Sequence, residues 1–251
     1  MNSIGPPWPP TPWAPDEWIR RLGTLPLMHQ PGERWMYNTG SQVLGILVER
    51  AVGKPLEAFL RQRLFEPLGM VDTAFSVPPG KLDRFTTAYA PDAETGALRV
   101  LDAAADSWWS RPPALPDAAG WLVSTIDDYW AFVQMILNRG EYRGRRILSE
   151  LVVDRMTSDH LSAEQRAAAK LFLGDGGGWG FGLRVPAAGG ATGRIPGGFG
   201  WDGGSGTTWR SDVDRGITGI LLTQRAMTSP EPPEVFDDFW TCAYGAIART
   251  L

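Results

Sequence analysis

The chain has 251 residues and a formal net charge of −4, an acidic balance that argues against a nucleic-acid partner because phosphate backbones bind to basic surfaces. No apolar run approaches the roughly 18 residues that a membrane span needs, and the first residues lack the basic and apolar regions of a signal peptide, so we expect a soluble, cytoplasmic protein without a membrane partner. Cys242 is the only cysteine, which excludes an internal disulfide and a cysteine-based metal site, and we expect neither a metal nor another cofactor.

The N-terminal stretch predicts irregular chain followed by a short helix. Residues 1–14 are rich in proline and favour an extended, polyproline-like conformation. Pro15 is suited to a first helical position and is followed by two acidic residues. This pattern predicts a helix to about Leu22, with Trp18 and Leu22 on one face.

A tyrosine precedes the first long helix that the sequence predicts. After a turn at Pro31-Gly32, Tyr37 stands directly before Asn38 and Thr39, either of which is suited to cap a helix start. Gly53 predicts the end of this helix. Its apolar residues recur at helical spacing and predict a buried face formed by Leu44, Leu47, Val48 and Ala51. Tyr37 is therefore expected at a helix N-terminus, whose positive dipole end favours an ionised phenol.

The middle of the chain reads as helices around a long loop. A second amphipathic helix is predicted from Leu56 to about Leu64, closed by Pro67 and Gly69. Residues 77–117 show no periodicity and predict a loop. Within it, Trp108 and Trp109 are interpreted either as the wall of a cleft or as ordinary packing.

Capping patterns mark three further helices. Residues 124–127 predict a capping box for a helix to about Asn138, and Ser149 and Ser162 each predict a helix start. The pair Asp159-His160 lies in the turn between the last two helices. We interpret it as solvated, because no serine motif accompanies it.

The C-terminal third predicts an antiparallel meander and a final helix. The glycine-rich run 174–185 lacks the strand–turn–helix context of a dinucleotide site, so its glycines are expected at a tightly packed sheet edge. Strands are predicted at 179–185, 199–210 and 217–223. A helix from about Pro233 is expected to face the sheet through Val235, Phe236, Phe239, Trp240, Ala243, Tyr244 and Ile247. The predicted fold class is α+β.

Two separate motifs resemble the serine β-lactamase-like hydrolases, the family of class C β-lactamases, D-Ala-D-Ala peptidases and related esterases. Pro31-Gly32-Glu33, Tyr37 and Val43-Leu44-Gly45 resemble its tyrosine motif, and Trp201-Asp202-Gly203 resembles the strand motif of its esterase-like branch. The resemblance implies one β-lactamase-like domain over residues 1–251. A helical lobe would span about 38–170, and a sheet with the C-terminal helix about 171–251.

The sequence departs from this family at the nucleophile. The family's serine lies in Ser-x-x-Lys upstream of the tyrosine, whereas none of the three lysines here follows a serine by three residues. Either the chain is truncated at its N-terminus or the protein works without that pair of residues. Thr39 also stands where the lactamases carry asparagine, which favours simple esters over β-lactams.

The resemblance assigns roles to residues of both motifs. Tyr37 would be the proton shuttle, while the Gly203-Gly204 backbone would approach the substrate and offer an N–H. Trp201 would bound the acyl pocket, Asp202 would orient Tyr37 or polar substrate atoms, and Thr39 would contact the substrate. Substitute nucleophiles are Ser41 and Ser205, although a purely structural role is open for each.

The sequence therefore predicts a carboxylic-ester hydrolase, weak because Ser-x-x-Lys is absent. The alternative is an inactive pseudoenzyme or fragment that retains a ligand cleft, completed by a second chain. We expect a homo-oligomer, because an uncovered apolar helix face and an open strand edge favour association.

Overall fold

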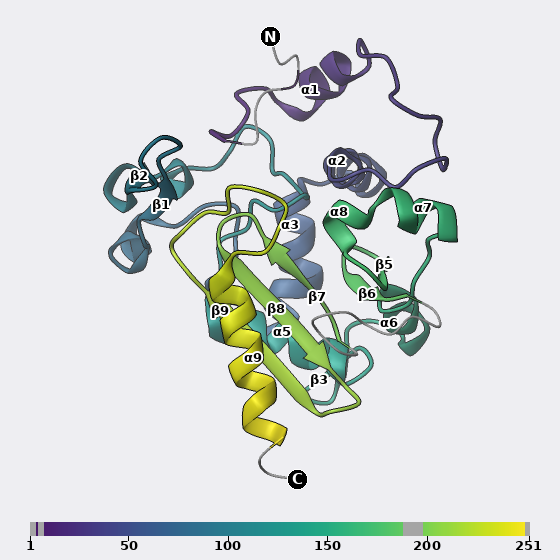
Figure 1. Ribbon diagram of the computed structural model, residues 1–251. Helices are drawn as coiled ribbons and strands as arrows, with labels where there is room; N and C mark the ends of the chain where they lie inside the picture. The colour runs from purple at the N-terminus through teal and green to yellow at the C-terminus, as the bar shows by residue number, and fades with distance from the viewer. Residues whose placement is uncertain (1–3, 5–7, 188–197, 249–251) are drawn as a thin grey trace. The chain divides into compact units, whose positions relative to one another are not determined.

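The computed structural model describes residues 4, 8–187 and 198–248 (Figure 1). The chain divides into two compact units, the first formed by Met1–Thr87 with Asp102–Phe132 and the second by Ala88–Leu101 with Val133–Leu251. Helices and antiparallel strands are mixed within the chain. The predicted α+β class is confirmed.

The first unit is built mainly from helices. They are α1 (Pro15–Leu22), α2 (Thr39–Val52), and a continuous helical stretch formed by α3 (Leu56–Leu60), η1 (Arg61–Phe65) and α4 (Glu66–Leu68). Short 3₁₀ helices follow at η2 (Pro79–Arg84), η3 (Ala104–Asp106) and η4 (Trp108–Ser110), and the first turns of α5 (Ile126–Leu137) complete the unit. The predicted starts at Pro15 and stops at Gly53 and Gly69 are confirmed, the two glycines having φ of 64° and 71°.

The core of the first unit forms where α1 meets α2. Trp18 is 1% exposed and packs with Ile46 and Leu115. Helical spacing marks Leu44 and Leu47 as a face to be buried, but within this chain they are 56% and 59% exposed, which agrees with the uncovered apolar face on which the expected association depends. The helix instead buries the neighbouring stripe of Val43 and Ile46, because that stripe meets Trp18.

The long loop predicted at residues 77–117 contains a hairpin. Strands β1 (Ala88–Pro91) and β2 (Leu98–Asp102) pair across a turn in which the Asp92 carboxylate accepts from the backbone N–H groups of Glu94 and Thr95. Further along, the Trp109 ring stacks on Trp121 at 4.6 Å between centroids, and its indole N–H donates to the Trp121 carbonyl. Trp109 therefore packs within the first unit.

The second unit, to which nearly all of the β1–β2 hairpin belongs, continues after α5 with a second small hairpin and three short helices. The hairpin joins β3 (Glu141–Tyr142) to β4 (Arg145–Arg146), and the helices are α6 (Glu150–Met156), α7 (Ala163–Ala168) and α8 (Lys170–Leu173). Ser149 and Ser162 cap α6 and α7 as predicted. The cap of α5 is Thr125, whose hydroxyl accepts from the Asp128 N–H at 3.3 Å, because the Ser124 hydroxyl bonds instead to Thr73.

A five-stranded antiparallel sheet forms the centre of the second unit. Its order is β5 (Gly177–Trp179), β6 (Arg184–Pro186), β7 (Phe199–Gly203), β8 (Thr207–Asp212) and β9 (Ile217–Leu222). The predicted meander is confirmed, but two of the three predicted strands were wrong in length. Each is split by a glycine-containing turn, at residues 180–183 and 204–206.

Helix α9 (Glu234–Ala248) runs along β8 and β9 (Figure 1). The Trp240 indole N–H donates to the Thr208 hydroxyl at 3.1 Å, and a Cβ on Gly219 would lie 2.8 Å from the Trp240 ring. Val235 is 45% exposed, contrary to prediction, because Phe236 and Trp240 form the packed face. The predicted contact of Ile247 lies outside the side chains that the structure describes.

Candidate active site

Tyr37 lies two residues before α2, as the sequence predicts. Its side chain is 38% exposed, and its ring stacks on Trp35 with 5.8 Å between centroids. Thr39 and Ser41 follow in the first turn of the helix, both half-buried, and the Ser41 N–H donates to the Asn38 carbonyl at 2.9 Å. In the sequence, the tyrosine thus stands just before the start of α2, and one candidate nucleophile, Ser41, stands just after it.

A buried carboxylate contacts this helix start, and the sequence analysis missed it. Asp117 is 9% exposed, and its Oδ2 accepts from the Gln42 amide at 2.6 Å. Burial raises the pKa of Asp117, and the hydrogen bonds from Ala119 and Gln42 only partly offset that rise. The two residues are 75 positions apart, and Asp117 stands in an aperiodic stretch, so no local pattern connects them.

The second motif lies on β7 and the turn that follows it. Trp201 is half-buried and meets Trp179 edge-on at 4.8 Å between centroids. The turn is held by its own backbone, since the Gly203 carbonyl accepts from Gly206 and the Gly204 carbonyl accepts from Met227, both at 2.9 Å. Gly204 and Ser205 are exposed on this turn, so it presents a hydroxyl on a fixed backbone.

Asp202 is engaged by an arginine that the sequence analysis also missed. Its Oδ2 accepts from the Arg210 guanidinium at 2.7 Å, and the Arg210 side chain is 4% exposed. Arg184 shares this environment: burial, and next the positive charge of Arg210, lower its pKa. The strand register brings the two arginines to the same level of the sheet, because Arg184 on β6 and Arg210 on β8 both pair with Gly200 on β7.

Asp159, interpreted above as solvated, is buried. Its side chain is 3% exposed and accepts from the backbone N–H groups of Leu161 and Trp179 and from Arg166. The solvation prediction was wrong for this residue because the turn folds onto β5. Its neighbour His160 is exposed and stacks on Phe181 at 4.8 Å.

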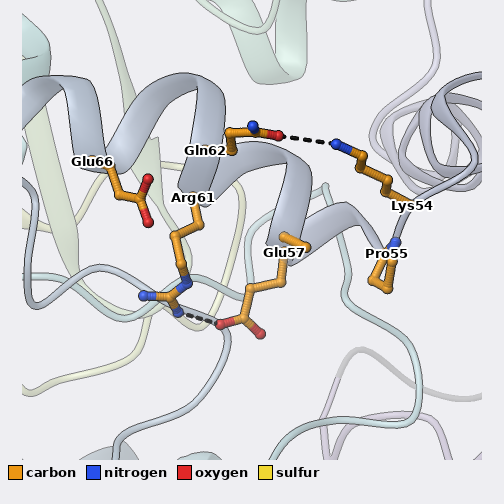
Figure 2. Close-up of a pocket in the computed structure, with 7 residues that line it drawn as sticks. Lys54, Pro55, Glu57, Arg61, Gln62 and Glu66 are labelled. Atoms are coloured by element: carbon orange, nitrogen blue, oxygen red, sulfur yellow. Dashed lines mark hydrogen bonds and ion pairs between the residues drawn. The ribbon is translucent and has the colours of Figure 1, made fainter.

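A hollow of about 580 Å³ lies on the first unit, away from both motifs in sequence (Figure 2). Two of its side-chain pairs are hydrogen-bonded: Lys54 donates to the Gln62 amide oxygen at 3.1 Å, and Arg61 forms an ion pair with Glu57 at 2.7 Å. The lining contains no serine, cysteine, histidine or tyrosine, and consists of Lys54, Pro55, Glu57, Ala58, Arg61, Gln62 and Glu66. This hollow therefore offers no nucleophile.

No helix in the described part of the chain has the length and apolar character needed to cross a bilayer.

Comparison with known proteins identifies relatives over most of the chain. An uncharacterised protein of Mycobacterium tuberculosis (strain CDC 1551 / Oshkosh) is 35% identical over 218 residues, which cover 84% of this chain and 54% of the relative. Esterase EstB of Burkholderia gladioli is 32% identical over 241 residues, which cover 87% of this chain and 56% of the esterase. The chain thus spans about half the length of these curated relatives.

A solved structure shows the same fold, and a family model matches the sequence. A mutant of simvastatin synthase from Aspergillus terreus superposes with a TM-score of 0.72 at 21% identity, covering 93% of this chain and 61% of that one. The model of the family described as Beta-lactamase matches residues 3–237, which include both the tyrosine motif and the β7 motif. This chain therefore belongs to the beta-lactamase family.

Proposed function

We propose that this chain acts in acyl transfer from carboxylic esters, with Tyr37 as the proton shuttle. The observation that carries the proposal is the 32% identity to an esterase over 87% of the chain. Two motifs further support the proposal: the tyrosine before α2, and Trp201-Asp202-Gly203 on β7. Acyl transfer needs a nucleophile, a base within hydrogen-bond reach of it, and N–H donors for the developing oxyanion.

We assign these roles as the motifs suggest. Tyr37 moves the proton, the Gly203-Gly204 backbone offers an N–H to the substrate carbonyl, and Trp201 bounds the acyl group. Thr39 contacts the substrate. For Asp202, Oδ2 accepts from Arg210 and Oδ1 is buried, so we assign this carboxylate to holding the β7 motif in place rather than to direct contact with the substrate.

Two serines are the candidate nucleophiles within this chain. Ser41 follows Tyr37 by four residues in the first turn of α2, where a helix N-terminus favours a developing alkoxide. Ser205 is exposed on a turn whose backbone is fixed by hydrogen bonds to Gly206 and Met227. Neither is followed three residues later by a lysine, so each would lack the activating group of a Ser-x-x-Lys pair.

A second function is favoured by this missing Ser-x-x-Lys. Without an activating lysine, the chain would bind an ester or an acyl group without efficient turnover. In this case the same tyrosine and strand motifs would serve recognition only. For either function, we propose that residues 1–251 form a single domain. We also propose that this domain associates with a second copy of the chain.

One experiment separates the two functions. The purified chain is assayed with a short p-nitrophenyl ester and then treated with a fluorophosphonate probe, and the labelled peptide is identified by mass spectrometry. Turnover that falls in Tyr37→Phe but not in Tyr142→Phe, with labelling on Ser41 or Ser205, supports the hydrolase. Saturable binding of the ester without turnover or labelling supports the recognition function, and neither binding nor turnover contradicts both.

A further inference from the structure

Helix α2 begins without the usual local stabilisation. Asn38 occupies the N-cap position, but its side chain makes no capping hydrogen bond, and the first turn contains no acidic residue. A capping side chain typically contributes about 0.5–2 kcal/mol to a helix start. Unless another part of the fold holds this turn, it frays, and Tyr37 lies only two residues before it.

The segment at residues 117–118 supplies that support. The Gln42 amide in the first turn donates to Asp117 Oδ2 at 2.6 Å, and the carboxylate is itself fixed by the Ala119 N–H at 2.7 Å on Oδ1. One turn further on, a Cβ placed on Gly45 would lie 2.8 Å from the Ala118 Cβ. The helix start and this segment are therefore in direct contact, with no space for a larger side chain at position 45.

The carboxylate is held by amide donors at the positive end of a helix. Within the described residues, Asp117 forms no ion pair, and the two hydrogen bonds to its carboxylate come from Gln42 and Ala119. A negative group near a helix N-terminus is stabilised by the helix dipole. The hydrogen bond between Gln42 and Asp117 thus pairs one donor with one acceptor. A substitution that turns the donor into an acceptor should break it.

We propose that Asp117 and Gln42 are positioning residues for Tyr37. Through their hydrogen bond they fix the first turn of α2, and this turn fixes the backbone that carries the phenol. The inference rests on the proposed function only in the role given to Tyr37, because the positioning itself is a property of the folded chain.

The pairing allows a reversal test. Gln42→Glu places a second carboxylate against Asp117, and two carboxylates at this distance cannot both ionise without repulsion. Adding Asp117→Asn restores one donor and one acceptor with the hydrogen bond reversed. Gln42→Leu removes the donor without adding charge, which keeps the test decisive if the glutamate variant does not fold.

The position of Tyr37 is read by fluorine NMR of the full chain labelled with 3-fluorotyrosine. The chain has five tyrosines, and the Tyr37 signal is assigned by its loss in Tyr37→Phe. We expect Gln42→Glu and Gln42→Leu to shift or broaden this signal at pH 8, with Tyr142 and Tyr244 unchanged. Asp117→Asn/Gln42→Glu should return the signal to its wild-type position, and acidification should reverse the effect of Gln42→Glu alone.

Ester turnover gives the second measurement. A misplaced catalytic group typically costs up to about 100-fold, so we expect Gln42→Glu to lower kcat by about 10- to 100-fold with little change in KM, and the double variant to recover it. If the wild-type chain turns over no ester, the proposed function fails while the NMR result still decides this inference.

The matched control introduces the same repulsion elsewhere in the first unit. Thr73→Asp sets a carboxylate against buried Asp128, which accepts from the Thr73 hydroxyl at 2.9 Å in the wild type. It should lower stability without moving the Tyr37 signal. The inference is overturned if Thr73→Asp displaces Tyr37 as much as Gln42→Glu does, or if folded Gln42→Glu and Gln42→Leu both leave the signal unchanged.

Discussion

Asp202 and Arg210 form a buried ion pair between neighbouring strands of the central sheet, with 2.7 Å between Oδ2 and the guanidinium. The pair is incomplete: among the described residues, Asp202 Oδ1 and Arg210 Nε are buried and have no hydrogen-bond partner. Removing one member of a buried pair leaves an uncompensated charge, which typically costs about 3–5 kcal/mol.

Arg210→Met should therefore lower the free energy of unfolding by about 3–5 kcal/mol in urea titrations, since it removes one member of a buried ion pair and leaves the Asp202 carboxylate without this partner. Arg61→Met is the control, because Arg61 pairs with Glu57 on the surface, where such pairs contribute about 0–1 kcal/mol. A loss below about 1 kcal/mol for Arg210→Met would contradict the buried ion pair as a source of stability.

Asp117→Asn should stabilise the protein at neutral pH. Burial raises the pKa of Asp117 in the folded state. The protonated side chain therefore contributes stability that is fully present below the unfolded pKa of about 4. This contribution is lost as the pH rises through the folded pKa. Asparagine carries no charge, accepts from the Ala119 N–H through its oxygen and donates through its amide to the Gln42 oxygen once the Gln42 amide is rotated. Thermal unfolding should show a higher Tm than wild type at pH 7, with the difference shrinking towards pH 4.

Asp92→Asn is the control of opposite sign. Hydrogen bonds, first of all from the Thr95 backbone N–H, lower the pKa of Asp92, so its contribution is present above the unfolded pKa and is lost as pH falls. This variant should lose stability at pH 7 and match the wild type in acid. Equal behaviour of the two variants would contradict the assigned cause, the burial of Asp117.

Ester turnover by the chain is expected to be weak. A positioned base contributes about 10²–10⁴ in rate, and neither Ser41 nor Ser205 has the lysine of a Ser-x-x-Lys pair. Initial rates on a p-nitrophenyl ester should fall further in Ser41→Ala or Ser205→Ala and stay unchanged in Ser229→Ala. A rate typical of complete enzymes that survives both substitutions would reveal a different nucleophile.

The chain is expected to self-associate through α2. Leu44 and Leu47 are more than half exposed on this helix, and apolar surface of this kind favours association. Light scattering at micromolar concentration should give a multiple of the single-chain mass of 27.5 kDa, and Leu47→Asp should reduce it. Leu151→Asp, at an equally exposed leucine on α6, should have no effect. A wild-type mass of one chain would refute the expectation.

Local signals in the sequence predicted the elements whose formation depends on local chemistry. Pro15, Ser149 and Ser162 start helices as expected because a cap or a first-turn proline acts within a few residues. Gly53 ends α2 because glycine adopts the left-handed conformation without cost. The motif residues Tyr37 and Trp201 were likewise found from short patterns.

What the sequence did not predict depends on contacts between distant residues. The partner of Asp202 is eight positions away on the next strand, and the partner of Gln42 is 75 positions away. The buried stripe of α2 was misassigned because both Leu44-Leu47 and Val43-Ile46 have helical spacing, and only the position of Trp18 decides between them. Periodicity defines an apolar face but not the element that covers it.

The glycines of residues 174–182 resemble a flexible linker in composition, yet three of them are among the most confined positions of the second unit. A side-chain carbon on Gly177, Gly178 or Gly180 would collide with Leu173, Asp159 or Met156, respectively. A protein engineer who chose this glycine-rich run as a place for a tag, a protease site or a circular permutation would therefore separate β5 from the helices that pack on it. Insertions would be better tolerated at Gly144, where an added side-chain carbon would have no neighbouring atom within 4 Å.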